Sequence, residues 1–184
     1  MNEYIDIVTK EGIPTGQSTL KSDIHVKGYY HNTAHIWFYT KKGEILLAQR
    51  SAVKLIYPLL WDVSVAGHVD AGETIETPAI REIKEEINLT ISVDQLKKIA
   101  VTECFQTYPN GIVDNEFHHT FISELPVKLN DLVLDKNEVE NIKLVNLLEF
   151  QRLIDNIGST HHFVPSNKSN YQFILQSIKE AIKI

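Results

Sequence analysis

The sequence predicts an α/β protein of the α+β type, in which helices cover a mixed β-sheet. Patterns typical of strands occur over residues 3–9, 34–40, 44–49, 61–66, 97–105 and 117–123. Helical spacing of apolar residues occurs over residues 77–87, 145–156 and 169–183. These elements follow one another without regular β-α alternation, which favours a mixed sheet over a doubly wound parallel sheet.

Turn and cap residues set the limits of several elements. The segment Lys41-Lys42-Gly43 indicates a hairpin between the second and third strands, because Gly allows the positive φ of a tight turn. A further short strand is expected at residues 88–91. The first helix is expected to begin with Thr77 as N-cap and Pro78 as its first residue, with Thr74 as a rival N-cap.

The length and composition predict one cytoplasmic domain. A chain of 184 residues suits a single domain, and no repeat or linker divides residues 1–184. No apolar stretch reaches the length of a membrane span, and the N-terminus lacks the apolar core of a signal peptide. Cys104 is the single cysteine, which precludes an intrachain disulfide and indicates a reducing compartment.

The charge of the chain limits its partners. A formal net charge of −6 argues against a nucleic acid polymer as partner, because such binding needs clustered Lys and Arg. An acidic protein that acts on a phosphate compound needs a divalent metal to bridge the two sets of negative charge. No membrane partner is expected, and a homodimer is left open.

Acidic and apolar side chains occupy separate faces of the helix expected at residues 77–87. A helix turns about 100° per residue, so side chains at i, i+3 and i+4 share one face. The acidic face holds Glu82, Glu85 and Glu86, and the roughly opposite face holds Ile80, Ile83 and Ile87. Like charges so spaced destabilise a helix by roughly 0.2–0.5 kcal/mol per pair, and a cation such as Mg²⁺ would reverse that effect. The alternative is an ordinary solvated acidic face.

The segment before this helix favours the metal site. Gly67 and Gly72 bracket a loop that Glu73 closes, and Arg81 lies near enough in the sequence to pair with Glu73. Together these residues resemble the Nudix box over residues 67–89. The matching positions are Gly67, Glu73, Arg81, Glu82, Ile83, Glu85, Glu86 and Leu89. Asn88 replaces the usual Gly, and Asn is the next best residue for ending a helix in the left-handed conformation.

This resemblance implies an α/β/α sandwich that hydrolyses a diphosphate linkage in a small, nucleoside-diphosphate-type substrate. It implies Mg²⁺ or Mn²⁺ held by Glu82, Glu85, Glu86 and the Gly67 carbonyl. Glu73 would be a partner of Arg81 or an indirect ligand, and Arg81 is counted with the catalytic residues. The general base would be Glu86 or Glu116, an acid outside the box.

A wider pattern over about residues 3–150 is similar to the isopentenyl-diphosphate isomerases, which share the Nudix fold. By that resemblance, five residues would hold a metal: His25, His31, His68, Asp114 and Glu116. His35 is an alternative to His31. The isomerases place an essential cysteine where this chain has Ala66, so we expect a hydrolase. An isomerase and a catalytically silent nucleotide-binding module remain the alternatives.

Other side chains are weighed as substrate ligands. Arg50 and Lys54 could bind phosphate oxygens, or could be solvated cations. Trp61 could stack on a base, although a buried structural role is the better expectation. His68 adjoins the box glycine, and only one of the pair His118-His119 can face a cleft if both lie on a strand.

Overall fold

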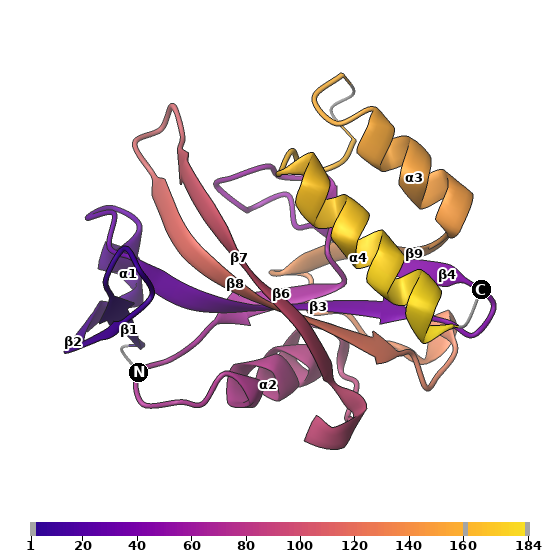
Figure 1. The fold of residues 1–184 in the computed structure, drawn as a ribbon, viewed down its shortest axis with the longest axis horizontal. Helices are drawn as coiled ribbons and strands as arrows, with labels where there is room; N and C mark the ends of the chain where they lie inside the picture. Colours follow the sequence, from indigo (N-terminus) through magenta and orange to yellow (C-terminus); the bar gives the residue numbers. More distant parts are fainter. Residues whose placement is uncertain (1–2, 160–161, 183–184) are drawn as a thin grey trace.

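The structure, a computed structural model, describes residues 3–159 and 162–182. Helix α2 (Glu76–Ile87) lies on one face of a mixed sheet, and helices α3 (Leu147–Asp155) and α4 (Lys168–Ala181) cover the other (Figure 1). The sheet contains β3 (His31–Tyr39), β4 (Glu44–Arg50), β5 (Trp61–Asp62), β6 (Val65–His68), β7 (Lys97–Thr107), β8 (Val113–Glu124) and β9 (Val139–Asn146). The predicted mixed sheet between helices is confirmed.

Strand β3 is the centre of the sheet. It runs parallel to β8 along its whole length, and β8 pairs with β7 in antiparallel fashion. On its other side β3 meets β4 only at Tyr39 and Ile45, while β6 pairs with residues 33–36. Strand β9, which was not predicted, pairs along β4. This arrangement places Gly67 and His68 beside the start of β3.

Two hydrophobic cores lie on opposite faces of the sheet. Side chains alternate along β3, so Trp37 packs toward α3 and α4 while Ile36 and Phe38 pack toward α2. The first core includes Phe150 of α3 and Tyr171 of α4, which both lie close to Trp37.

The N-terminal residues form a separate small hairpin. Strands β1 (Tyr4–Val8) and β2 (Pro14–Leu20) pair with each other and lead into the short helix α1 (Lys21–Ile24). His25 follows α1 directly. Two single-turn helices, η1 (Val93–Gln95) and η2 (Leu129–Asp131), complete the described elements. Within the described ranges, no helix is both long and apolar enough to cross a membrane.

Several predicted boundaries are wrong for local reasons. Residues 88–91 form no strand: Leu89 and Ile91 are buried in the core beside α2 without a pairing partner. Helix α2 begins at Glu76, so Pro78 lies inside its first turn, where a missing N–H costs no helical hydrogen bond. The hydroxyls of Thr74 and Thr77 contact each other at 3.1 Å, and neither caps the helix.

The remaining boundaries differ less. The segment predicted as one strand at residues 61–66 is divided between β5 and β6. The helix predicted at 145–156 begins at Leu147, because residues 145–146 complete β9 and Asn146 caps the helix by accepting from the Glu149 N–H. The C-terminal helix runs from Lys168 to Ala181, and predicted position 183 lies outside the described residues.

Candidate active site

A cavity of about 520 Å³ lies among strands β3, β6, β7 and β8, with side chains of α2 and α4 in its wall. Its described lining includes the carboxylates Glu3, Asp62, Glu82, Glu85, Asp114, Glu116, Asp135 and Glu138. The Lys and Arg side chains of the same lining are Lys21, Arg50, Lys54 and Arg81. Each of these four cations already lies in an ion pair with a carboxylate. The lining therefore carries an excess of negative charge.

Helix α2 packs its apolar face on the sheet as the sequence predicts, while its acidic face agrees with the prediction only in part. Ile83 and Ile87 are fully buried against the sheet. Glu82 and Glu85 line the cavity, with Glu85 mostly exposed. Glu86 differs from the prediction: it is 6% exposed and is not part of the lining, so it lies behind the cavity wall rather than in the open cleft.

Gly67 allows Glu82 to reach the cavity. A Cβ atom at residue 67 would lie 2.1 Å from the Glu82 carboxyl carbon, closer than any real contact allows. Gly67 is paired with Ala34 in the sheet, so its backbone has little freedom to move away. Residue 67, the first of the predicted box, is thus glycine because Glu82 occupies the space that any larger side chain would need.

Arg81 joins the loop to the helix. Its guanidinium donates to the Glu73 carboxylate at 3.3 Å, which confirms the predicted pairing, and to the His68 carbonyl at 3.1 Å. It also pairs with Glu82 at 2.8 Å and Glu85 at 3.4 Å. Arg81 therefore holds two of the predicted metal-binding carboxylates close together.

Burial makes these acids hard to ionise. Burial, with repulsion from Glu85, raises the pKa of Glu82 to about 7, although the charge of Arg81 opposes the shift. Burial and the charges of Glu82 and Glu138 raise the pKa of Glu86 well above its usual range. A bound divalent cation would lower both pKa values, so the acids fit a metal site.

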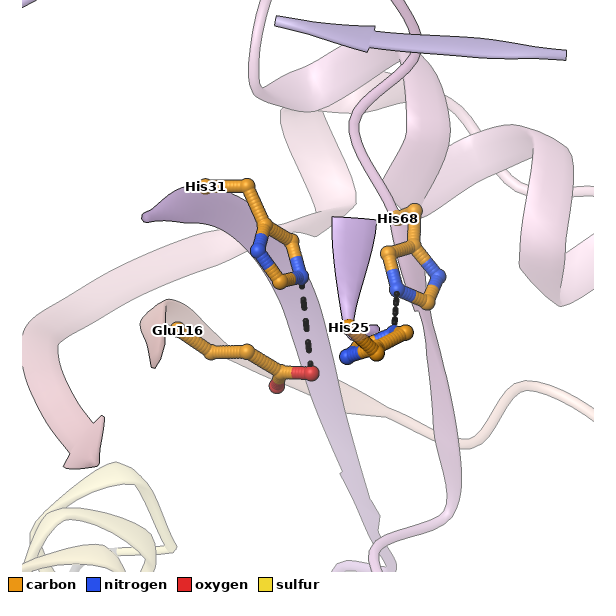
Figure 2. A group of neighbouring side chains, drawn as sticks. All are labelled: His25, His31, His68 and Glu116. Atoms are coloured by element: carbon orange, nitrogen blue, oxygen red, sulfur yellow. Dashed lines mark hydrogen bonds and ion pairs between the residues drawn. The ribbon is translucent and has the colours of Figure 1, made fainter. Parts of the chain in front are cut away.

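Four further side chains converge beside the same cavity (Figure 2); three of them line it, whereas His31 is fully buried and is not part of the lining. His25, His31, His68 and Glu116 each offer one ligand atom, and these atoms all lie within 4.8 Å of one another. The Nε2 atoms of His25 and His68 are 2.9 Å apart, and His31 Nε2 is 3.6 Å from Glu116 Oε1. We call these four residues the histidine cluster. His25 directly follows α1, and the other three lie on strands β3, β6 and β8, so chain folding alone brings them together.

The hydrogen bonding of His31 fits a metal. Its Nδ1 lies 3.0 Å from the Tyr29 carbonyl oxygen and donates to it, which leaves Nε2 as an acceptor. This Nε2 is buried, has no hydrogen-bond partner and faces a carboxylate oxygen. Two acceptors facing each other repel unless a cation lies between them. Burial also lowers the pKa of His68 to about 3, so its ring is neutral, as a metal ligand must be.

The structure differs from the five-ligand set that the isomerase resemblance implies. Between the two candidates, His31 belongs to the histidine cluster, whereas His35 stacks on His118 with ring centroids 3.9 Å apart. Asp114 is not part of the cluster. Its Oδ1 lies 2.9 Å from His25 Nδ1, the ring nitrogen that faces away from His68.

Three of the four predicted substrate ligands line the cavity, and Trp61 does not. Arg50 and Lys54 line the cavity, paired with Asp62 and Glu138. His68 lines it as a member of the histidine cluster. Trp61 is not part of the lining: it packs beside the core under α3 and α4, with the Lys143 ammonium 4.3 Å from its ring. Base stacking on Trp61 is therefore not supported.

Sequence reasoning missed several cavity residues. Antiparallel pairing places Cys104 opposite Glu116, and both line the cavity together with Ala66. His118 faces the cavity and lies 2.8 Å from Glu116 Oε2, while His119 points to the other side and contacts Asn32. The single-face expectation for this pair is confirmed. The register of β7 against β8 places Cys104 in the cavity wall, and the spacing of residues in the sequence does not reveal that register.

Comparison with protein families matches residues 29–165 to the NUDIX domain. The chain belongs to the Nudix family. This Nudix protein is 34% identical over 157 residues to Nudix hydrolase 3 of Arabidopsis thaliana, covering 83% of this chain and 20% of that longer protein. It is also 34% identical over 156 residues to isopentenyl-diphosphate Delta-isomerase 2 of Photorhabdus laumondii, covering 85% of this chain and 84% of that protein.

Solved structures share the Nudix fold. DR0079 of Deinococcus radiodurans superimposes with a TM-score of 0.71 at 18% identity, over 92% of this chain and 98% of that one. The NUDIX domain of Shewanella oneidensis NrtR, determined with ADP ribose, has a TM-score of 0.59 at 12% identity, over 80% and 87% of the two chains. At these identities the likeness concerns the fold.

Proposed function

We propose that this Nudix protein is a metal-dependent hydrolase that cleaves a diphosphate linkage in a small substrate. Glu82, Glu85, Glu86 and the Gly67 carbonyl would hold Mg²⁺ or Mn²⁺. The observation that carries the proposal is the set of carboxylates on one face of α2, two of them buried with raised pKa values. Such a set is unfavourable without a cation.

The charge of the cavity supports a role for metal in substrate binding. A diphosphate brings negative charge into a lining whose Lys and Arg side chains are already paired. When bound, the divalent ion would supply charge neutralisation and Lewis acidity toward the diphosphate. Arg81 would keep Glu82 and Glu85 oriented through its contacts with both.

Two acids compete for the role of general base. Glu116 lines the cavity, but the neighbouring imidazoles of His118 and His31 hold its pKa well below the usual range despite burial. Burial raises the pKa of Glu86, which makes its carboxylate a stronger base, but Glu86 lies behind the cavity wall. Comparing Glu116→Gln with Glu86→Gln in pH–rate profiles tests which proton acceptor limits the reaction.

The expected substrates are small diphosphate compounds. A cavity of about 520 Å³ suits a small molecule. The NrtR domain was determined with ADP ribose, so nucleotide sugars and related diphosphates belong in a screen. The screen should include nucleoside diphosphates, dinucleotides, nucleotide sugars and prenyl diphosphates, each tested with Mg²⁺ and with Mn²⁺.

The decisive variants are Glu85→Gln and Glu86→Gln. A divalent ion contributes several kcal/mol of transition-state stabilisation, so each variant should lose about 10²-fold or more in kcat. Glu103→Gln is the matched control, because Glu103 is exposed on β7 and outside the cavity lining. Near-normal turnover by Glu85→Gln and Glu86→Gln, with the fold intact, would refute the site assignment.

Isomerisation of isopentenyl diphosphate is the second candidate. The observations that favour it are the 34% identity to an isomerase and the presence of Cys104 in the cavity beside Glu116. Ala66 has no proton to give, but the Cys104 thiol has one. Solvent deuterium entering carbon, and its loss in Cys104→Ser, would identify this reaction. Tight binding of diphosphates without turnover under either metal would instead indicate a silent binding module.

A further inference from the structure

We propose that Thr33 and His35 are specificity residues that bind a hydroxylated group of the substrate. The diphosphate compound would then carry a sugar-like organic group rather than a hydrocarbon chain. This inference rests on the diphosphate substrate proposed above and specifies its organic part. It does not require the linkage to be cleaved, so binding of a probe that cannot be hydrolysed separates its failure from that of the hydrolase proposal.

The floor of the cavity is a polar area of the central sheet. Strands β3, β8 and β7 lie side by side, and side chains alternate between the two faces of the sheet. In one row across these strands, Thr33 is paired with His118 and His118 with Thr102. In the next row, His35 is paired with Thr120. All five side chains line the cavity, and we call them the polar floor.

Thr33 has a hydrogen-bonding group without a partner. Its side chain is 3% exposed, and its hydroxyl oxygen is buried with no hydrogen bond to the described part of the chain. Buried polar groups in proteins are nearly always hydrogen-bonded, and a valine would fill this space without leaving a polar group unpaired. Because Thr33 lines the cavity, its partner can come from a bound molecule.

His35 adds a second polar group to the floor. Its ring stacks on that of His118 with the centroids 3.9 Å apart, which limits its rotation. His118 directs its Nε2 at Glu116, whereas the ring nitrogens of His35 make no hydrogen bond to the residues that the structure describes. A neutral imidazole offers one donor and one acceptor, and a hydroxyl group can pair with either.

The opposite side of the cavity includes an apolar surface. Thr33 and His35 lie on the same face of β3 as Trp37, and helix α4 covers this face (Figure 1). Tyr171 and Ile174 of α4 both line the cavity. A sugar ring has apolar faces and an edge of hydroxyl groups, so it can contact α4 and bond to the polar floor at once.

A hydrocarbon chain fits this cavity less well. A prenyl group could pack on the apolar side chains of α4, but it would leave the polar groups of Thr33 and His35 buried without partners. A site built to bond a substrate hydroxyl discriminates strongly against an analogue that lacks the hydroxyl. The polar floor therefore favours a hydroxylated substrate over a prenyl diphosphate.

The test compares two esters of methylenediphosphonate, in which a carbon bridge replaces the bridging oxygen and prevents hydrolysis. One ester carries ribose, and the other carries a dimethylallyl group, which has the same number of carbon atoms. Titration calorimetry with Mg²⁺ measures the dissociation constant of each. The main variant is Thr33→Val, which keeps the shape of the side chain. Thr107→Val is the matched control, because Thr107 is exposed on β7 and outside the cavity lining.

The proposal predicts a change in preference between the two esters. The wild type and Thr107→Val should bind the ribosyl ester at least about 10-fold more tightly than the dimethylallyl ester. Thr33→Val should bind the ribosyl ester about 10-fold more weakly than the wild type and the dimethylallyl ester no more weakly. His35→Phe, which keeps an aromatic ring beside His118, should shift the preference in the same direction.

Folding stability separates this role from a structural one. Because the Thr33 hydroxyl has no partner in the described chain, Thr33→Val should unfold at the same urea concentration as the wild type or at a higher one. A hydroxyl that held the fold together would give a lower unfolding midpoint.

Two results would overturn the proposal. A wild type that does not prefer the ribosyl ester, including one that binds neither ester, would remove the inferred specificity. Equal losses for both esters in Thr33→Val and His35→Phe would show a general disturbance of the cavity instead of a lost bond. If Thr33→Val does not fold, the ratio of the two affinities in His35→Phe decides the question.

Discussion

At Gly67 the absence of a side chain decides where Glu82 can lie. A Cβ atom added at residue 67 would clash with the Glu82 carboxyl group. The described chain contains other glycines at left-handed turns, but Gly67 has an ordinary φ and is needed for space instead. A spacing pattern in the sequence marks the residue without revealing this reason.

Gly67→Ala should therefore displace Glu82 and lower both stability and activity. Overpacking of this kind costs about 1–3 kcal/mol of unfolding free energy. The double variant Gly67→Ala with Glu82→Ala should recover most of that stability, because the clash is gone, while remaining inactive. Urea unfolding of the wild type, both single variants and the double variant measures the coupling. Simple additivity of the two single effects would show that the two residues do not compete for one space.

Site residues were predictable to different degrees. The acids of α2 and the pairing of Arg81 with Glu73 follow from helical spacing and the box pattern. His25, His31 and His68 could be named only by resemblance, since nothing in their spacing brings them together. The positions of Asp114 and Cys104 in the cavity depend on side-chain direction and strand register, which a single sequence does not determine.

Helix α2 shows how local chemistry ends an element. Asn88 adopts φ 52° and ψ 32°, as expected for a residue in the usual glycine position, and its N–H donates to the Ile83 carbonyl. Its side chain also accepts from Lys84 at 2.7 Å. The expected left-handed end of the helix is therefore confirmed.

Substitutions at Asn88 should separate backbone strain from side-chain bonding. Asn88→Gly should change the unfolding free energy by less than about 1 kcal/mol, since Gly adopts this φ freely but loses the contact with Lys84. Asn88→Ala should be less stable than Asn88→Gly by about 1 kcal/mol, because its Cβ is strained at positive φ. Equal stability of the two variants in urea unfolding would contradict a strained left-handed cap.

Elements with strong periodicity were predicted better than those that depend on a partner. The faces of α2 and the β3–β4 hairpin follow from local patterns. Residues 88–91 look like a strand but lack a neighbour to pair with, and they supply core side chains instead. Strand β9 forms because it pairs with β4, which is distant in the sequence. The residues of β9 alone do not reveal this long-range pairing.

For the molecule as a whole, the buried acids link stability to pH and metal. Glu82 has a pKa of about 7 in the folded state, above the ordinary carboxyl value of 4.5. Between these pH values the folded protein keeps a proton that the unfolded chain has lost. Glu82 alone should therefore lower the unfolding free energy of the metal-free protein as pH rises through this range, by up to roughly 3 kcal/mol.

Urea unfolding from pH 5 to pH 8 checks this prediction. Glu82→Gln should remove the contribution of Glu82, since its amide does not titrate, while the histidines with shifted pKa values titrate in both proteins. Added Mg²⁺ should stabilise the wild type more at pH 8 than at pH 5, because binding needs the ionised carboxylates. A pH dependence of stability that is the same in the wild type and in Glu82→Gln would show that this acid is not a coupled group.

The cavity is assembled from segments distant in the chain, so its chemistry belongs to the whole fold. Helix α2 supplies the acids of the Nudix box. Most of the histidine cluster lies on β3, β6 and β8, and its remaining member, His25, follows α1. The same cavity therefore contains acids of the proposed hydrolase site and lies beside the histidine cluster, which resembles the metal site of the isomerases.

The most direct test of the central claim follows oxygen from water. A diphosphate substrate identified in the screen is turned over in ¹⁸O-labelled water, and the masses of its products are measured by mass spectrometry. Hydrolysis predicts one ¹⁸O atom in one phosphate-containing product, dependent on Mg²⁺ or Mn²⁺ and strongly reduced in Glu85→Gln and Glu86→Gln. An intact diphosphate that takes deuterium from heavy water into carbon, with no ¹⁸O in any phosphate, would contradict it.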